Sequence, residues 1–262
     1  MPALPFLLLL FLAALLGGAQ NAVAGGGTFL TFPSLVAAGF DSKAANVTST
    51  VALWPGSVAS IFGYKADLPR DRRLLLAFAA VSVVGGALGA LLFLRTPSAT
   101  FDRLIPFLFA LATLIFALGP SIARRLRIAH AHDGPVPAGK LAAYAGVQLL
   151  VGLYGGYFGG GIGILMLAAF AALGMANLNT MNSLKAVLGS LINGVAILVF
   201  GLLGAIAWPV ALLMVAGSVV GGYGGAHLSR RAEPLLLRRL VILVGTFVTT
   251  LLFLKAFVPA AA

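Results

Sequence analysis

The chain of 262 residues contains no cysteine and only six acidic residues. Without cysteine it has no disulfide framework, no thiol chemistry and no cysteine-based metal site. No predicted span carries the buried carboxylate that commonly binds a proton or a sodium ion in a cation-coupled carrier. The six carboxylates all fall in loops or at the ends of apolar segments: Asp41, Asp67, Asp71, Asp102, Asp133 and Glu233.

Catalytic groups are equally scarce. The sequence has no carboxylate pair inside a span, no His-Glu-x-x-His motif and no obvious pairing of a nucleophile with a base. His130 and His132 lie close together, but two histidines without further ligands do not make a metal site. We therefore predict that the protein is not an enzyme and that it binds no cofactor and no metal ion.

Charge of either sign is low. Charged residues make up 9% of the chain and hydrophobic residues 61%, with a mean hydropathy of +1.08, whereas soluble domains carry roughly 25% charged residues. A chain of this composition is predicted to live in a lipid bilayer. Its net charge of +11 comes from scattered basic residues that set orientation and contact lipid headgroups, so nucleic acid is not an expected partner.

Ten apolar segments are predicted to be helices, because open strands cannot span lipid. The fold class is therefore an all-α, polytopic integral membrane protein. A full span needs about 20 residues, so the segments at 28–40 and 162–175 are predicted to be half-helices or arms of re-entrant hairpins. The first segment has no basic region before it and is read as a retained span, not a cleaved signal peptide.

The two halves of the chain repeat one another. The run Ser82-Val83-Val84-Gly85-Gly86 returns 136 residues later, at 218–222, and the triplet at 25–27 is answered by Gly159-Gly160-Gly161. A duplicated apolar chain with a glycine break in each half is typical of secondary transporters. We predict two inverted-topology repeats, at 1–122 and 140–262, joined by a cytoplasmic linker at 123–139.

Basic residues predict the orientation of these repeats. They gather in three loops, around Arg72, Arg125 and Arg231, which all fall on one side when the crossings are counted. The positive-inside rule places that side in the cytoplasm and both termini outside.

The glycine triplets and one lysine predict a substrate site. A glycine break in lipid must face a polar cavity or be buried in protein, and a half-helix that follows it aims its positive dipole end there. Lys185 is the one charge well inside an apolar segment, where burial costs roughly 3 kcal/mol; the alternative is that it snorkels to the headgroups. The candidate substrate-binding residues are Gly26, Gly27, Asn46, Thr48, Ser49, Gly160, Gly161, Asn182, Ser183 and Lys185.

Other residues have simpler predicted roles. The glycines at 85, 86, 89, 221, 222 and 225 recur at the spacing of helix–helix packing. Gln20, Asn21 and Ser190 could contact a ligand or form hydrogen bonds between helices. Trp54 could line the substrate pocket. Aromatic residues are often interface anchors, and candidates for that role are Trp208, Tyr64, Tyr144, Tyr154, Tyr157 and Tyr223.

The motifs around the glycine triplets resemble a known family. Gly-Gly-Gly-Thr-Phe-Leu-Thr-Phe-Pro-Ser-Leu at 25–35 and Ala-Asn-Val-Thr-Ser-Thr at 45–50 are similar to the first half of the sulfite exporter TauE/SafE family of membrane permeases. Gly-Gly-Tyr-Phe-Gly-Gly-Gly-Ile-Gly at 155–163 and Asn-Ser-Leu-Lys at 182–185 are similar to the second half. The resemblance implies transport of sulfite, sulfonates or related anions in the bacterial inner membrane.

These observations lead to one predicted function with alternatives. The chain is expected to be a multi-pass inner-membrane carrier that moves a small sulfur-containing anion by alternating access. A carrier for another small anion, such as a carboxylate, and an anion channel remain open, whereas a membrane enzyme or receptor lacks the necessary groups. The expected partners are the anion and the bilayer, and a homodimer is left open.

Overall fold

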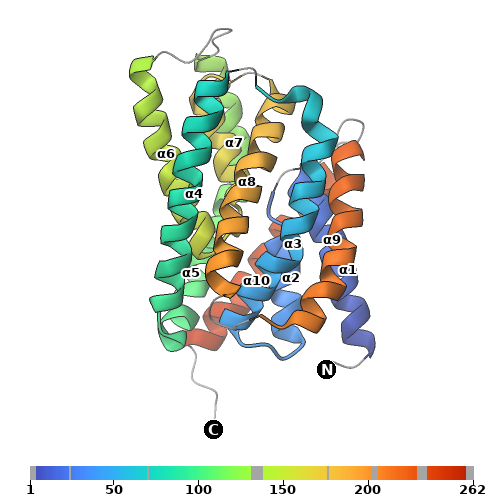
Figure 1. The fold of residues 1–262 in the computed structure, drawn as a ribbon. Coiled ribbons are helices and arrows are strands. Elements are labelled where there is room, and N and C mark those ends of the chain that lie inside the picture. The colour runs from blue at the N-terminus through green and yellow to red at the C-terminus, as the bar shows by residue number, and fades with distance from the viewer. Residues whose placement is uncertain are drawn as a thin grey trace.

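The fold is an all-α bundle, as predicted from composition (Figure 1). The computed structural model describes residues 4–23, 25–69, 71–130, 138–175, 177–201, 206–228 and 235–257, and these contain helices and no strand. Residues 131–137, which belong to the predicted linker at 123–139, and residues 229–234 lie outside the described residues. In chain order the helices are α1 (Leu4–Val23), α2 (Thr28–Ala37), α3 (Ser42–Tyr64), the 3-10 turn η1 (Lys65–Asp67), α4 (Arg72–Arg95), α5 (Ser98–His130), α6 (Ala138–Tyr157), α7 (Ile162–Ala172), α8 (Leu178–Gly201), α9 (Trp208–Leu228) and α10 (Leu235–Phe257).

Two of the α-helices are much shorter than the others. Among the described residues five stretches are long and apolar enough to cross a membrane, whereas α2 has 10 residues and α7 has 11. At 1.5 Å per residue each short helix covers about half of a hydrocarbon core of about 30 Å. The predicted half-helices are therefore confirmed. The five long stretches are Leu4–Val23, Arg72–Arg95, Ser98–Gly119, Leu178–Gly201 and Trp208–His227.

Carboxylates cap helices at the ends of the bundle. Asp41 accepts a hydrogen bond from the Ala44 amide at 2.9 Å and so caps α3. Asp71 accepts from the amides of Arg73 and Leu74 and caps α4. An N-cap of this kind stabilises a helix by about 1 kcal/mol, which gives these two acidic residues a role outside the membrane interior.

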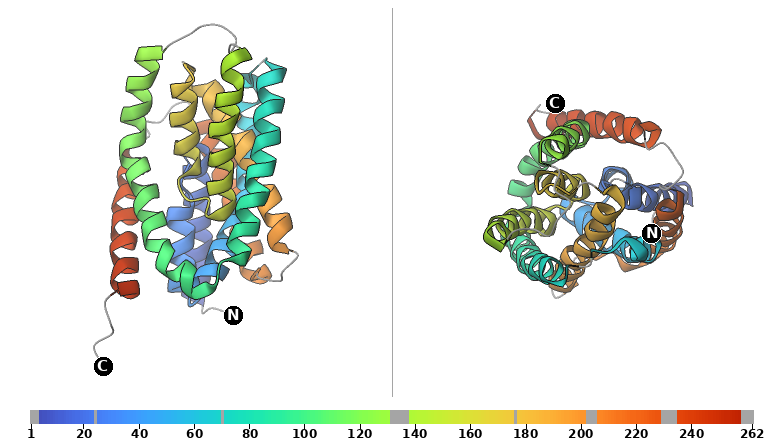
Figure 2. Two further views of the ribbon diagram at one scale, coloured as in Figure 1. Left: turned by 90° about the vertical axis from the view of Figure 1, so that its left-hand side faces the viewer. Right: turned by 90° about the horizontal axis from the view of Figure 1, so that it is seen from above.

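The helices pack across the two halves of the sequence. α1 packs on α9 and α4 packs on α6. α3 packs mainly on α9, α8 packs mainly on α4, and α3 and α8 contact each other. α10 lies at the rim of the bundle beside α5 (Figure 2). The corresponding helices of the two halves are α1 and α6, α3 and α8, and α4 and α9. When each of these helices is replaced by its counterpart, the same set of contacts results.

Glycines make the closest of these contacts, as their spacing predicted. A Cβ added at Gly85 or Gly89 of α4 would collide with the backbone of α6, and one added at Gly221 would collide with the Leu15 carbonyl of α1. Small residues allow helix backbones in a membrane to approach in this way. The glycine face of α4 and that of α9 therefore join the two halves.

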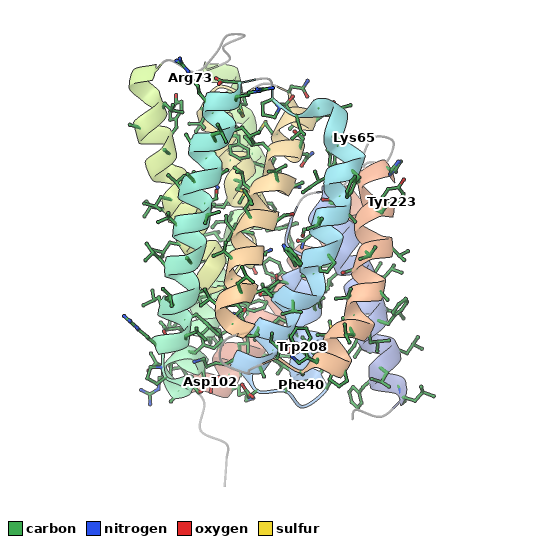
Figure 3. The ribbon with its side chains drawn as sticks, viewed as in Figure 1. Phe40, Lys65, Arg73, Asp102, Trp208 and Tyr223 are labelled. Carbon is green, nitrogen blue, oxygen red and sulfur yellow. The ribbon has the colours of Figure 1, made fainter. Side chains whose placement is uncertain are left out.

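The ends of the bundle separate the basic loops from the termini. Lys65 and Arg73 lie at one end, whereas Phe40, Asp102 and Trp208 lie at the other (Figure 3). α1 begins and α10 ends at the Asp102 end (Figure 1). This arrangement is the one expected if the Lys65 end faces the cytoplasm.

That orientation can be tested in a chain without native cysteine. We expect Asp102→Cys to react with a membrane-impermeant maleimide in intact cells. Lys65→Cys should react only after the cells are permeabilised, because the positive-inside rule places this end in the cytoplasm. Both side chains are exposed, so the two variants control for one another. The reverse labelling pattern would contradict the orientation.

Candidate substrate site at the two helix breaks

The first helix break joins α1 to α2 and is held by polar side chains of α1. Gly25 and Gly26 have φ angles of 84° and 90°, the left-handed region that favours glycine. The Gln20 side-chain amide donates to the Gly25 carbonyl at 3.1 Å, and the Gly27 amide donates to Asn21 Oδ1 at 2.7 Å. Gln20 and Asn21 therefore satisfy backbone groups that the break frees from the helix.

The second helix break joins α6 to α7 and has a similar backbone. Gly159 and Gly161 have φ angles of 77° and 75°, and the Tyr154 hydroxyl donates to the Gly160 carbonyl at 2.6 Å. A Cβ added at Gly25 would lie 2.7 Å from the Cα of Gly163 in the first turn of α7. The two breaks, about 135 residues apart in the sequence, therefore touch backbone to backbone.

Lys185 of α8 lies buried beside the first break. Its side chain is 5% exposed, and its ammonium donates to the Ala22 carbonyl in the last turn of α1 at 3.2 Å. The Tyr64 hydroxyl also donates to this carbonyl, at 3.3 Å. An ammonium has three donors, and the described residues offer Lys185 no carboxylate. The side chain does not snorkel to the surface.

Each break is bonded by a side chain from the opposite half of the sequence. Lys185, in the second half, bonds Ala22 before the first break. Asn46 of α3, in the first half, donates from its amide nitrogen to the Tyr157 carbonyl before the second break, at 3.3 Å. This crossed arrangement links the two breaks through α3 and α8, which also contact one another where Trp54 Nε1 donates to the Ser190 carbonyl at 2.9 Å.

The remaining predicted site residues lie to either side of the breaks. Ser49 is fully buried, and its hydroxyl is 2.5 Å from that of Thr31 in α2. Thr48 Oγ1 accepts from the Ala207 amide at 3.5 Å. Ser183 instead donates to the Asp67 carbonyl of η1 at 3.0 Å, toward the Lys65 end. The structure thus brings the two triplets together but keeps the Asn46–Ser49 and Asn182–Ser183 clusters apart.

Several buried polar atoms near these elements have no hydrogen-bond partner. Leaving such an atom unsatisfied costs about 1–3 kcal/mol, and it therefore marks a place where a ligand or water would bind. As they stand, the Asn46 and Asn182 oxygens can accept a hydrogen bond from a ligand or water, and the Ser190 hydroxyl can donate one. The unpartnered atoms are Gln20 Oε1, Asn46 Oδ1, Asn182 Oδ1 and Ser190 Oγ.

Three tyrosines that were candidate interface anchors are wholly or partly buried in the bundle. Tyr64 is fully buried, Tyr157 is 9% exposed, and Tyr154 is partly buried with its hydroxyl on the second break. Tyr64 and Tyr154 are not interface anchors, because their hydroxyls bond the carbonyls of Ala22 and Gly160 inside the bundle. The Tyr157 hydroxyl instead bonds Thr96 at the end of α4, at 3.3 Å, which is the level expected of an anchor. Trp208 and Tyr223, by contrast, are 53% and 52% exposed, as an anchor requires.

The two serines are expected to respond differently to substitution. Ser49→Ala should weaken anion binding about tenfold, because it removes a hydroxyl beside the first break and frees Thr31. Ser183→Ala should change affinity much less, since that hydroxyl is bonded to backbone carbonyls at 2.8 and 3.0 Å. Ser57→Ala is the control in α3, because Ser57 bonds the Leu53 carbonyl of its own helix. Equal losses in both serine variants, measured by titration calorimetry, would contradict this distinction.

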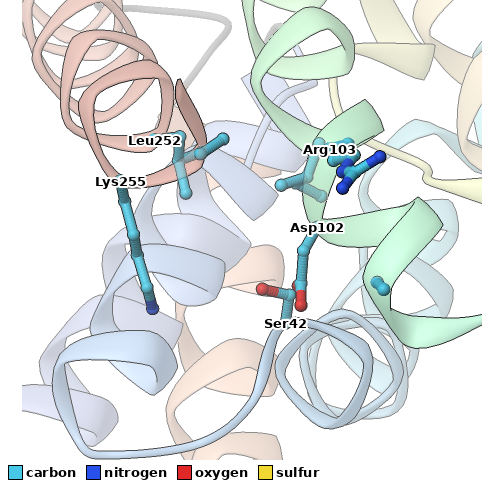
Figure 4. A pocket seen from close by; sticks show the side chains of 8 residues that line it. Ser42, Asp102, Arg103, Leu252 and Lys255 are labelled. Atoms are coloured by element: carbon cyan, nitrogen blue, oxygen red, sulfur yellow. The ribbon is translucent and has the colours of Figure 1, made fainter. Parts of the chain in front are cut away.

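A polar cavity lies apart from the breaks, at the Asp102 end. It has a volume of about 300 Å³ and lies between α3, α5 and α10. Figure 4 shows Lys255 and Asp102 on opposite sides of it, with Ser42 beside Asp102. Because the lining carries charges of both signs, this cavity does not favour a simple anion.

The fold and the paired breaks define a class of protein, a polytopic membrane transporter. The sequence matches the family model described as "Sulfite exporter TauE/SafE" over residues 10–252. The chain therefore belongs to the TauE/SafE family of membrane transporters, as its glycine-rich motifs indicated.

Relatives from several bacteria cover nearly the whole chain. "Probable membrane transporter protein YfcA" of Escherichia coli K12 is 29% identical over 92% of this chain and 87% of its own length. A "Probable membrane transporter protein" of Haemophilus influenzae is 26% identical over 93% and 92%. "Probable membrane transporter protein ORF9" of a Sinorhizobium species is 27% identical over 93% and 90%. No solved structure matches the chain.

Proposed function

We propose that this transporter moves a small sulfur-containing anion, sulfite or an organosulfonate, across the bacterial inner membrane by alternating access. The observation that carries the proposal is the buried Lys185 ammonium, which lies 3.2 Å from the Ala22 carbonyl beside the first break. A buried cation in a membrane is costly unless it meets a negative charge. A substrate anion would supply that charge.

The surroundings of Lys185 suit an anion better than a cation. One ammonium donor is bonded to Ala22, which leaves two for substrate oxygens. The N-terminal ends of α2 and α7 begin directly after the breaks, and their positive dipole ends favour negative charge. Ser190 can add a neutral donor, since its buried hydroxyl has no partner.

Alternating access is supported by the crossed packing of the two halves. The packed pairs are unchanged when the halves at 1–122 and 140–262 are exchanged, which is the arrangement expected for inverted repeats. Lys185 is 5% exposed, so the site is closed to water in this structure. A substrate reaches it only after one side of the bundle opens.

The proposal is tested by counterflow in liposomes that contain the purified protein. Vesicles loaded with unlabelled sulfite should take up labelled sulfite transiently above equilibrium, and sulfoacetate should compete while acetate should not. Competition by acetate instead would favour the carboxylate carrier. Flux that rises linearly with voltage and shows no counterflow would favour a channel and overturn alternating access.

A further inference from the structure

An apolar hollow opens on the side of the bundle next to the second break. Its volume is about 540 Å³, and it lies between the end of α4, the first half of α5 and the end of α6. Leu92, Leu104, Leu108 and Leu153 line it, and the first two are 51% and 40% exposed. Since α4 and the first part of α5 are long enough to cross a membrane, this hollow faces lipid hydrocarbon.

One positive charge marks the rim of the hollow. Arg95 is exposed and is the last residue of α4, where that membrane span ends. Its guanidinium therefore lies at the level of the lipid headgroups. An exposed ion pair at this depth is worth up to about 1 kcal/mol, and arginine can bind a phosphate with two parallel hydrogen bonds.

The floor of the hollow consists of residues that hold the second break. Tyr154 lines the hollow, and its hydroxyl donates to the Gly160 carbonyl at 2.6 Å. Tyr157 also lines it, and its carbonyl accepts the Asn46 amide at 3.3 Å. A molecule that fills the hollow would therefore lie against the two tyrosines whose hydrogen bonds hold the break in place.

We propose that this hollow binds one acyl chain of an anionic phospholipid, with the phosphate on Arg95, and that the bound lipid stabilises the second helix break through Tyr154. The occupant follows from the lining, because an apolar slot that ends in an arginine at headgroup level matches an acyl chain joined to a phosphate. The site is independent of which substrate is carried, and its test needs no transport.

The first experiment measures lipid retention by native mass spectrometry. Protein is exchanged into mixed micelles with equal phosphatidylglycerol and phosphatidylcholine of identical chains. We expect the wild type to retain the anionic lipid about fivefold over the neutral one. Arg95→Gln should remove this preference, and Leu104→Trp should lower retention of both lipids by filling the hollow. Arg103→Gln is the matched control, because Arg103 is exposed near the same end but lines the polar cavity.

The second experiment tests the link to the break. Phosphatidylglycerol should raise the Tm of the wild type, and Tyr154→Phe should lose that rise while it still retains the lipid. An equal Tm rise in Tyr154→Phe would overturn the link. An equal loss of preference in Arg95→Gln and Arg103→Gln would overturn the site in favour of general surface attraction. If Leu104→Trp turned a dimer into a monomer without changing lipid retention, a second copy of the chain would be the occupant and the lipid proposal would fail.

Discussion

Lys185→Ala is expected to abolish anion binding, with a loss of at least about a hundredfold in affinity. The substitution removes the buried charge and two donors that are free for the substrate, and each hydrogen bond to a charged group is worth about 1.5–3 kcal/mol. The variant should still fold, because the Ala22 carbonyl keeps its bond from the Tyr64 hydroxyl at 3.3 Å. Titration calorimetry with sulfite, alongside the Tm of each variant, measures both effects.

Two further variants separate the charge from the position. Lys43→Ala is the control, because Lys43 also donates to a backbone carbonyl, that of Thr96 at 2.8 Å, but lies in the first turn of α3. It should leave sulfite affinity unchanged. Lys185→Arg should keep part of the binding, since the charge survives while the shape of the donor group changes. Wild-type affinity in Lys185→Ala would remove Lys185 from the site and leave it as a partner of the α1 C-terminus.

Gly25→Ala is expected to cause a large loss of stability. A side chain at φ 84° is strained, which costs about 1–2 kcal/mol, and its Cβ would lie 2.7 Å from Gly163 Cα and 3.1 Å from Gly163 N. Backbone cannot move aside as a flexible side chain can, so the two breaks must separate. We expect a strongly lowered Tm and no sulfite counterflow.

Gly39→Ala isolates the contact from the backbone strain. Gly39 has a φ of 93°, but nothing lies within 4 Å of an added Cβ. This variant should therefore show only the conformational cost, about 1–2 kcal/mol, with transport retained. If Gly25→Ala and Gly39→Ala lowered the Tm equally, the contact between the breaks would not constrain the fold.

The sequence predicted the helix breaks because their cause is local. Three consecutive glycines interrupt a helix wherever they occur in an apolar run, and the short segments after 25–27 and 159–161 could only be half-helices at that length. The glycine faces at 85–89 and 221–225 could also be predicted from the sequence, since the spacing of these glycines alone puts them on one side of a helix. For Lys185 the sequence left burial and snorkelling as alternatives, because this residue lies within the first two to three turns of α8.

The partners of these residues could not be read from the sequence. Nothing local indicates that Lys185 bonds Ala22, or that Asn46 bonds Tyr157, because each pair spans more than a hundred residues. The partner of Tyr64 was hidden for the same reason. A tyrosine near the end of a span suits the membrane interface, and only the tertiary fold brings the Ala22 carbonyl to Tyr64.

The glycine faces of α4 and α9 have a mechanical consequence. Where no side chain separates two backbones, one helix cannot slide along the other without driving carbonyl groups into each other, because packed protein resists such strain. The pairs α1–α9 and α4–α6 are therefore expected to move as two rigid units. A movement that exposes Lys185 to water would therefore displace one pair relative to the other and leave the contacts within each pair intact.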